Sequence, residues 1–267
     1  MAVAVNAKDC IAILTGNESE DLADLNRCLA LVAANVLPSC ADRVDVLVFH
    51  ESSFNPLVPH VVARFDLRFV EIAFEVPAYP ADVMALIPEY FQHPTQSARG
   101  RPGFSMGYRH MCRFFAGAMY EHPAIQEYRR CLRLDTDSAV LTPMAHDVFA
   151  WAERENVQYG YIAPGMQVDC PLVGHGFHEF LSAYRPGEAL PARDTVFYTN
   201  IEMSDVRWFR SGAYDDYWRA VDRSAGIYLH RWGDHLIKYA GVQMLMDPRR
   251  LRPMTGFTYQ HGAVFRV

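Results

Sequence analysis

The sequence lacks the segments that carry a protein into or across a membrane. It has no run of about 18 apolar residues, the length that a membrane-spanning helix needs. Its start, MAVAVNAKDC, has no positively charged stretch followed by a long apolar one, so it does not resemble a secretory signal peptide. As the sequence is written, we therefore expect a cytoplasmic protein with no membrane span in this chain.

The sequence also lacks a CxxC pair. Its six cysteines are scattered along the chain, which argues against a zinc site. An even number of cysteines permits disulfide bonds. In a chain of 267 residues without a signal peptide, however, we expect buried free thiols.

Positive charge is scarce, since 25 Lys and Arg residues face 31 Asp and Glu residues and the formal net charge is -6. A nucleic-acid binder is expected to show a basic face, so the composition argues against that class. No repeat, low-complexity segment or clear linker interrupts the chain, and we predict a single α/β domain over 1–267. Aromatic residues make up 13% of the chain, which suits a large core and an aromatic-lined pocket.

The first part of the sequence has the pattern of alternating strands and helices. Apolar runs at 10–16, 45–51 and 67–76 predict buried strands, and 17–37 carries apolar residues at helical spacing. Strand, helix and strand at this spacing form a βαβ unit, so we expect a mixed, mainly parallel sheet flanked by helices. Further along, the pattern predicts helices at 105–122, 212–224 and 234–246. It predicts a strand at 129–137, two short strands joined by a turn within 195–211, and an extended tail at 257–267. Pro and Gly residues indicate a loop with one short helix at 77–105 and a loop at 163–174.

Two carboxylates stand at the end of the apolar, strand-like run RRCLRLDTDSAVL. Only Thr136 separates Asp135 from Asp137, and two acids this close repel each other unless a cation or solvent lies between them. Mg²⁺ and Mn²⁺ prefer oxygen ligands, and in open parallel sheets ligands bind beyond the carboxyl ends of the strands. The pair is a candidate site for a metal and a nucleotide phosphate. The alternative is a solvated turn in which Asp137 accepts local backbone hydrogen bonds.

Three further stretches place polar side chains among apolar ones, as the wall of a cleft would. They are YRHMCR in a predicted helix, FYTNIEM in a predicted strand, and GIYLHRWGDHL just before a helix. A structural interpretation is open for each, since Arg and Glu can form a buried pair, Trp232 can anchor a core and Asp234 can cap a helix. The candidate residues in these stretches are Tyr108, Arg109, His110, Arg113, Asn200, Glu202, Tyr228, His230, Arg231, Trp232 and Asp234.

These stretches resemble a known family, the fungal α-1,2-mannosyltransferases of glycosyltransferase family 15. YRHMCRFFAG is close to a hallmark segment of that family, and RWGD is identical to the core of its most recognisable block. LRLDTDSAV resembles the family's strand with a modified DxD, FYTNIEM its W-S-N-F-E-I segment, and TYQHGAVF its C-terminal GYxH. The matches occur in order, from about residue 10 to the C-terminus.

The resemblance implies a single glycosyltransferase-A-like domain, with a nucleotide-binding part at about 8–140 and an acceptor-binding part at about 141–267. It implies GDP-mannose as the donor and Mn²⁺ (or Mg²⁺) as the cofactor. It also implies retention of the anomeric configuration and transfer to a mannose-type hydroxyl in α-1,2 linkage. The implied partners are a nucleotide-sugar donor and a glycan acceptor, with no nucleic acid.

The resemblance also assigns roles to single residues. Asp135 and His261 are the implied metal ligands, with Asp137 in support. A departing GDP leaves negative charge on its phosphate, which a cation stabilises, while the anomeric carbon gains positive charge that carboxylate or phenolate oxygens stabilise. The implied catalytic residues are Tyr108, Glu202 and Asp234. The implied substrate-binding residues are Arg109 and Arg113 on phosphates, Tyr228 and Trp232 on a sugar face, and Asn200, Arg231, Thr15 and Gly16.

The sequence departs from the family pattern at several positions. Asp135 stands where the family has glutamate, Thr136 replaces proline, and His230 replaces the glutamate before RWGD. Lys238 lies in HLIK, where the family has APVH. Because these changes fall where sugars are expected to bind, a donor other than GDP-mannose stays open. Whether a residue acts as a covalent nucleophile stays open as well.

Other functions and another location are also consistent with parts of the sequence. A metal-dependent sugar-nucleotide phosphohydrolase or nucleotidyltransferase would use the same DxD, but it has no need of the aromatic RWGD pocket. An inactive sugar-binding module is expected to lose Asp135, Glu202 or His261, and all three are present. Members of the family are Golgi-lumenal and membrane-anchored, so the alternative to a cytoplasmic protein is a truncated Golgi-lumenal catalytic domain.

Overall fold

The structure is a computed structural model, and it describes residues 8–75, 83–86, 105–162, 166–167, 174–193, 195–262 and 265–266. Most of the predicted loop at 77–105 lies outside these residues, although the short helix expected in it is present as α2 (Val83–Leu86). The predicted loop at 163–174 also lies mostly outside them.

Seven strands form the central sheet, in the order β10-β6-β9-β4-β1-β2-β3. Two small sheets accompany it, one with the order β12-β11-β5 and one that pairs β7 with β8. The strands are β1 (Lys8–Leu14), β2 (Asp45–His50), β3 (Leu67–Glu71), β4 (Tyr128–Asp135), β5 (Ser138–Val140), β6 (Tyr159–Tyr161), β7 (Met166–Gln167), β8 (Thr195–Val196), β9 (Ile201–Asp205), β10 (Leu251–Pro253), β11 (Tyr259–His261) and β12 (Phe265–Arg266).

The central sheet is mixed and mainly parallel, which confirms the prediction. β1 pairs in parallel with β2 and β4, β2 with β3, and β6 with β10, whereas β9 runs antiparallel to both of its neighbours. Parallel strands that are buried on both faces have near-continuous apolar sequences, as β1 and β2 do. The carboxyl ends of β1 to β4 therefore meet at one edge of the sheet, where ligands bind in open α/β folds.

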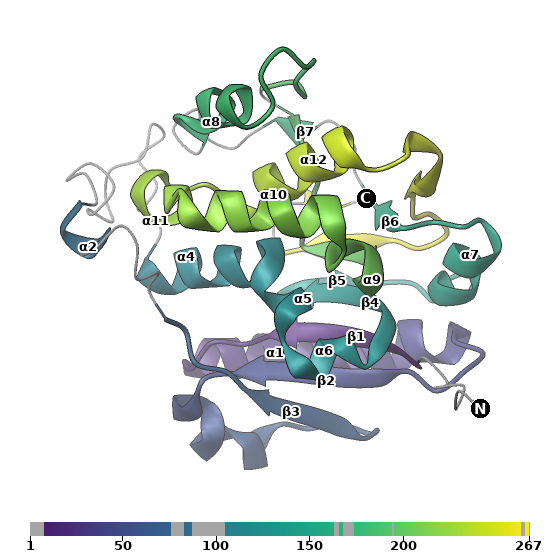
Figure 1. Cartoon of the computed structure of the whole chain (residues 1–267). Coiled ribbons are helices and arrows are strands. Elements are labelled where there is room, and N and C mark those ends of the chain that lie inside the picture. Colours follow the sequence, from purple (N-terminus) through teal and green to yellow (C-terminus); the bar gives the residue numbers. More distant parts are fainter. Residues whose placement is uncertain are drawn as a thin grey trace, which may run out of the picture.

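Helices cover both faces of the central sheet (Figure 1). α1 and α7 contribute to the core on one face, and α4, α10, α11 and α12 contribute to the core on the other, with α8 lying outermost beyond α12. The α-helices are α1 (Ser19–Leu31), α4 (Met106–Arg113), α5 (Met119–Glu121), α6 (Pro123–Gln126), α7 (Val148–Arg154), α8 (Phe177–Tyr184), α9 (Val206–Phe209), α10 (Gly212–Arg223), α11 (Gly226–His230) and α12 (Asp234–Leu245). Turns of π-helix follow α1 at η1 (Val32–Val36) and α4 at η4 (Phe114–Ala118), and turns of 3₁₀-helix lie at η2 (Leu37–Ser39), η3 (Ser52–His60) and η6 (Pro248–Arg250).

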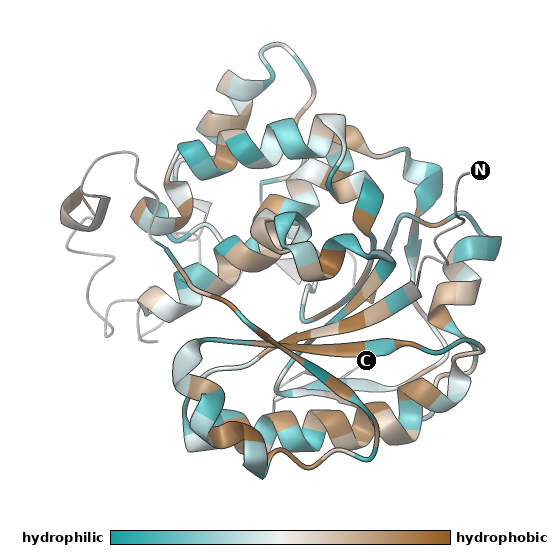
Figure 2. Ribbon diagram, turned by 60° about the horizontal axis from the view of Figure 1, so that its bottom comes forward, coloured by the Kyte–Doolittle hydropathy of each residue, from teal (hydrophilic) through white to brown (hydrophobic). Residues whose placement is uncertain are grey.

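Alternate residues of each central strand point into two separate cores. In β1, Ile11 and Ile13 face the core that contains α1, while Cys10 and Ala12 face the core beneath α4 and α10. Figure 2 shows the resulting distribution, with largely hydrophobic strands inside and hydrophilic residues on the outer parts of the helices. This double burial makes the sheet a rigid support for residues at its edge.

Two predictions about secondary structure are wrong in detail. The strand predicted at 67–76 ends at Glu71, because the chain leaves the sheet edge and Phe74 stacks on His110 with ring centroids 5.2 Å apart. The loop predicted at 163–174 contains β7, whose antiparallel partner β8 lies far along the chain. The two strands predicted within 195–211 both form, as β8 and β9, but they belong to different sheets.

The other predicted elements are present close to their expected positions. The helix expected at 105–122 is continued through the π-helical turn η4, and the tail expected at 257–267 provides β11 and β12. Five cysteines are described and all are free thiols. Among the helices of the described ranges, none has the length and the apolar character needed to span a bilayer.

Candidate active site

The candidate site lies at the carboxyl ends of β1 and β4, which are neighbours in the sheet. Leu14, the last residue of β1, is in register with Asp135, the last residue of β4. Thr15 and Gly16 follow directly, and the Thr15 N–H donates to the Phe49 carbonyl at 3.0 Å. A Cβ on Gly16 would meet the carboxylate of Asp21, so a glycine here lets α1 begin close to this edge.

Asp135, Asp137 and His261 form a compact group at this edge. β4 ends at Asp135, the chain turns through Thr136, and β5 begins directly after Asp137. β5 pairs with β11 so that Ser138 is opposite His261, which brings the imidazole beside the turn. One ligand atom from each of the three residues lies within 4.8 Å of the others.

Direct contacts hold this group together. His261 Nε2 lies 2.9 Å from Asp137 Oδ1, and the Asn200 amide, which donates to Asp135, lies 3.0 Å from His261 Nε2. Burial alone would lower the pKa of His261, but the carboxylate of Asp137 raises it above its ordinary value. Two carboxylates and an imidazole form a donor set that suits Mn²⁺ or Mg²⁺, so these residues fit a divalent cation.

Arg133 is the central cation of the site, and sequence reasoning missed it. Its side chain is 2% exposed, and its Nε and Nη2 donate to Asp135 Oδ1 at 3.1 and 2.9 Å. Its Nη1 donates to Asp234 and lies 3.7 Å from Glu202 Oε1. The guanidinium carbon also lies 3.6 Å from the centroid of the Phe115 ring. Arg133 thus links the candidate metal group to two deeper carboxylates.

Asp234 is the first residue of α12, where the positive end of the helix dipole favours a carboxylate. It accepts hydrogen bonds from Arg133 and from Thr199, the latter at 2.9 Å. Burial alone would raise the pKa of Asp234, but the Arg133 guanidinium holds it below its ordinary value. Asp234 is therefore a carboxylate that keeps its charge.

Glu202 and Lys238 form a fully buried ion pair behind Arg133. Both side chains are 0% exposed, and Lys238 Nζ donates to Glu202 Oε1 while the Tyr159 hydroxyl donates to Oε2. Glu202 on β9 is directly opposite Arg133 on β4 in the strand register. Burial lowers the pKa of Lys238, and the carboxylate of Glu202 opposes that effect. Both oxygens of Glu202 are thus engaged inside the protein.

α4 and α11 bring a second set of predicted residues to the site. Burial raises the pKa of Tyr108, with Cys112 and Asp234 within electrostatic range. Arg109 and Arg231 are buried, and burial together with the nearby charge of Arg231 lowers the pKa of Arg109. Guanidinium groups are the side chains that bind a phosphate by two parallel hydrogen bonds, so both residues suit that role.

Three predicted substrate-binding residues make contacts within the protein. Arg113 on α4 forms a two-pronged pair with Asp222 on α10, at 2.7 and 2.8 Å. The Tyr228 hydroxyl lies 2.9 Å from Nδ1 of His110, and the Trp232 indole N–H donates to the His175 carbonyl at 2.7 Å. Their direct contact with a substrate stays a prediction.

Signals for some of the missed residues exist in the sequence. Arg133 stands between Leu132 and Leu134 in an apolar strand, and a charge in such a place needs a buried partner. Lys238 is visible as a departure from the family pattern, but its partner on β9 is not. Tyr159 and Thr199 carry no signal that separates them from other residues of strands and turns.

The chain matches a known protein family. Residues 50–168 and 193–266, more than half of the chain, match the family described as glycolipid 2-alpha-mannosyltransferase. Similar curated proteins include the probable mannosyltransferase KTR3 of Saccharomyces cerevisiae, 27% identical over 176 residues that cover 60% of this chain and 43% of that protein. They also include the probable mannosyltransferase MNT3 of Candida albicans, 23% identical over 217 residues that cover 77% of this chain and 57% of that protein. The chain spans about half the length of these relatives.

Solved structures share the fold. Core-mannan synthase A (CmsA/Ktr4) from Aspergillus fumigatus, in its Mn/GDP form, superposes with a TM-score of 0.78 at 18% identity, covering 98% of this chain and 76% of that chain. The mannosyltransferase Ktr4p from S. cerevisiae in complex with GDP superposes with a TM-score of 0.77 at 18% identity, covering 97% of this chain and 72% of that chain. The fold predicted from the resemblance is confirmed.

Proposed function

We propose a function for this chain, which belongs to the glycolipid 2-alpha-mannosyltransferase family. It transfers mannose from GDP-mannose to a mannose-type hydroxyl of a glycan acceptor, in α-1,2 linkage and with retention of the anomeric configuration. The observation that carries the proposal is the group of Asp135, Asp137 and His261 at the carboxyl end of β4. The names of the similar proteins support a mannosyl donor, and the Mn/GDP form of a structural neighbour supports a metal and this nucleotide.

On the donor side, the chain offers a cation site and positive charge for a diphosphate. Asp135, Asp137 and His261 would hold Mn²⁺ or Mg²⁺, which supplies a Lewis acid beside the departing phosphate. Asn200 keeps the Asp135 carboxylate and the imidazole in place before any ligand arrives. Arg109 and Arg231 contribute the positive potential, and we assign Thr15 and Gly16, at the same sheet edge, to the nucleotide.

On the sugar side, the chain offers negative charge and a phenol. Asp234 stays ionised beside Arg133 and stabilises positive charge at the reacting carbon, with Tyr108 close to it. Overall, the bond from that carbon to the phosphate breaks, a bond to the acceptor oxygen forms with the anomeric configuration retained, and the acceptor proton leaves with the phosphate. Glu202 contributes through its charge and through Arg133, because both of its oxygens are occupied.

The first experiment is thermal unfolding with GDP, UDP, CDP and ADP, each with and without Mn²⁺. A ligand that binds only the folded state raises the melting temperature. We expect a large shift for GDP with Mn²⁺ and little for the other nucleotides. Transfer from GDP-mannose to methyl α-mannoside, with release of free mannose measured in parallel, then tests the reaction.

Variants show whether the metal assignment is right. Asp135→Ala should abolish the shift with GDP and Mn²⁺, whereas Asp66→Ala, at a carboxylate with a 93% exposed side chain far from the site, should leave it unchanged. A GDP shift in Asp135→Ala equal to that of the unsubstituted chain would contradict the metal assignment. A shift with UDP alone would move the donor to another sugar nucleotide, and release of mannose without transfer would favour a hydrolase.

A further inference from the structure

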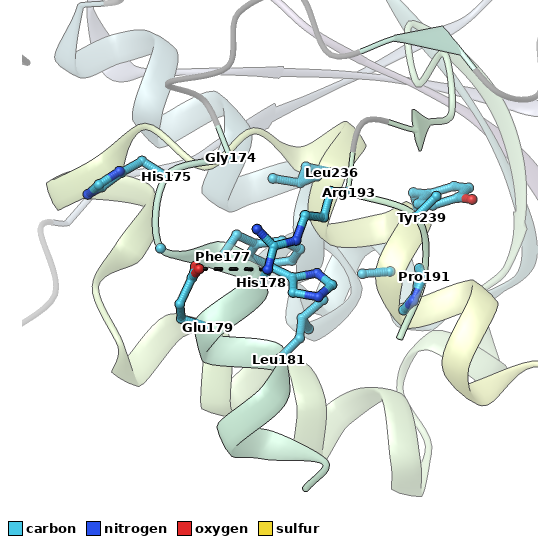
Figure 3. Close-up of a pocket in the computed structure, with 13 residues that line it drawn as sticks. Gly174, His175, Phe177, His178, Glu179, Leu181, Pro191, Arg193, Leu236 and Tyr239 are labelled. Atoms are coloured by element: carbon cyan, nitrogen blue, oxygen red, sulfur yellow. Dashed lines mark ion pairs between the residues drawn. The ribbon is translucent and has the colours of Figure 1, made fainter. Parts of the chain in front are cut away.

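A cavity of about 440 Å³ lies on the far side of α12 from Arg133. Its walls are α8, the segment 191–193 and the outward face of α12 (Figure 3). The volume falls in the range of small-ligand sites, about 300–1,000 Å³. The mechanism described above uses none of its lining residues.

The cavity has an apolar base and a polar rim. Phe177, Leu181 and Leu236 are buried at its base. Glu179 and Arg193 stand at the rim with 4.0 Å between their charged atoms, and Figure 3 shows the two side chains directed toward each other. His178 and Tyr239 add further hydrogen-bonding groups to the lining.

This combination selects a class of ligand. The Arg193 guanidinium is next to the Glu179 carboxylate, so the rim has no net positive charge to attract a phosphate. A purely apolar ligand would form no hydrogen bonds with the polar groups of the rim. A neutral ring with one apolar face and hydroxyl groups along its edge satisfies both parts, and a hexose unit has this chemistry.

The residues that line the cavity are in contact with the RWGD block. Asp234 and Lys238 lie on the inward face of α12, and Leu236 and Tyr239 lie on the outward face. The Trp232 indole N–H donates to the His175 carbonyl, and the Trp232 ring packs on Phe177 with centroids 5.0 Å apart. The cavity is therefore about one helix diameter, roughly 10 Å, from the residues around Asp234.

The outer wall belongs to a segment outside the family match. The match covers 50–168 and 193–266, and the intervening residues, which include α8, lie outside it. Its contacts with Trp232 show that this segment is nevertheless anchored to the motif that the family shares. Acceptor preference is a property that differs among enzymes with the same chemistry, and such segments are where differences of this kind arise.

We propose that this cavity is a subsite for a neutral hexose unit of an oligosaccharide acceptor, remote from the hydroxyl that reacts. The inference rests on the proposed function, and it specifies the substrate as an oligomannoside instead of a single sugar. A monosaccharide bound near Asp234 is too short to span the separation of roughly 10 Å, whereas an oligosaccharide is long enough. The subsite contributes to acceptor affinity and leaves GDP and metal binding unaffected.

The test compares two alanines exposed on this segment. Ala192→Trp fills the cavity from its rim, and Ala183→Trp places the same side chain on α8 outside the cavity lining. Initial rates are measured with GDP-mannose and either methyl α-mannoside or α-mannotetraose. We expect Ala192→Trp to lower kcat/KM for the tetraose about tenfold, the loss of about 1.4 kcal/mol, and to leave methyl α-mannoside unchanged. Ala183→Trp should behave like the unsubstituted chain with both acceptors.

Calorimetric binding of α-mannotetraose without donor makes the test independent of transfer. Weaker binding by Ala192→Trp than by Ala183→Trp supports the subsite even where the chain transfers nothing, a result that would contradict the proposed function alone. Equal behaviour of the two variants overturns the inference, as does an equal loss for both acceptors. Weaker tetraose binding in Ala192→Trp with unchanged transfer to the tetraose also overturns it, since the sugar would then belong to a glycan other than the acceptor.

Discussion

Arg133 and Lys238 share the buried negative charge of the candidate site between them. Arg133 contacts Asp135 and Asp234, and Lys238 contacts Glu202. A buried charge without a partner is strongly destabilising, so each cation is needed where its carboxylate is. By pairing with Glu202, Lys238 leaves the Arg133 guanidinium directed at Asp135 and Asp234.

The Glu202–Lys238 pair predicts a strong coupling between two substitutions. Lys238→Met removes the nearest counter-charge of the fully buried Glu202 and should lower the free energy of unfolding by about 3–5 kcal/mol. Glu202→Gln should be destabilising in the same way, because it leaves Lys238 without its counter-charge. The double variant Glu202→Gln/Lys238→Met removes both charges and should recover most of that loss. Urea unfolding of the three variants measures the coupling.

Losses that simply add in the double variant would show that the two side chains do not interact. Transfer activity gives a second result from the same proteins. Recovery of transfer along with stability in the double variant would assign Glu202 a positioning role through Arg133. Recovery of stability without transfer would show that the carboxylate itself acts on the substrate.

At the scale of single residues, the sequence identifies the members of the candidate site better than it identifies the residues that they contact. Asp135, His261 and Asn200 are each recognisable by their motifs, and the structure brings them together. The partnership of Arg133 with Asp234 depends on two elements that are far apart in the chain. No local pattern specifies such a contact, because it is set by the packing of α12 against the sheet.

Among the elements, α11 depends on a close contact with the ring of Trp232. A Cβ on Gly226, the first residue of α11, would lie 2.2 Å from carbon atoms of that ring. Trp232 in turn packs on Phe177 and Phe180 of α8. One glycine therefore sets the distance between α11, the RWGD block and the segment that forms the proposed subsite.

Gly226→Ala should consequently lower the free energy of unfolding by about 1–3 kcal/mol, the range for inserting a methyl group into a packed core. Gly107→Ala provides the matched control in α4, where the nearest atom to an added Cβ is Ser105 Oγ at 3.7 Å. That change should be stabilising by about 1 kcal/mol, since alanine favours a helix over glycine. Thermal unfolding of both variants measures the contrast, and a stable Gly226→Ala would contradict the contact.

Long apolar or amphipathic stretches are the elements that the sequence predicts well. The short elements α7, β6, α8, α11 and β10 lack such a pattern, and the sequence does not predict them. α11 also lacks the glycine that commonly ends a helix. Its flanking residues Ala225 and Arg231 adopt the left-handed conformation instead, with φ of 55° and 61°. β7 forms only because β8 supplies its partner, which is information that local sequence does not contain.

At the scale of the whole molecule, the two cores bury ionisable groups that are neutral at ordinary pH. Burial raises the pKa of Cys28 to about 12 and that of Tyr228 to about 12, from ordinary values of 9.0 and 10.0. A group whose pKa is raised by folding contributes stability below its ordinary pKa, and that stability is lost as the pH rises through the folded value. Alkaline conditions should therefore unfold the protein.

We expect the free energy of unfolding to fall from about pH 9 upward, by about 1.4 kcal/mol per pH unit for each such group. Urea unfolding between about pH 7 and pH 11 measures this slope. Cys28→Ala should make the free energy of unfolding fall less steeply from about pH 9. The contribution of Tyr228, which begins near its ordinary pKa of 10.0, should remain. A free energy of unfolding that stays constant over this range would show that these groups remain in contact with solvent.

The order of the central sheet is the part of the whole fold that the sequence leaves undetermined. The βαβ pattern correctly predicts that β1 and β2 run parallel. It does not predict that β9 inserts antiparallel between β4 and β6, although this insertion places Glu202 opposite Arg133. Family resemblance supplies the fold, but the pairing arises from contacts between distant segments.

The pairing of β5 with β11 affects how long the folded chain persists. Asp137 and His261 meet through this pairing, so the cation that we propose at this group would bind after the C-terminal strands have docked. Interactions formed after the folding transition state slow unfolding and leave the folding rate unchanged. Stopped-flow measurements should show unfolding slowed by Mn²⁺, about tenfold for each 1.4 kcal/mol of binding, with refolding unaffected. Faster refolding with Mn²⁺ would instead place these strands in the folding nucleus. The cation is thus expected to prolong the lifetime of the folded chain without helping it to form.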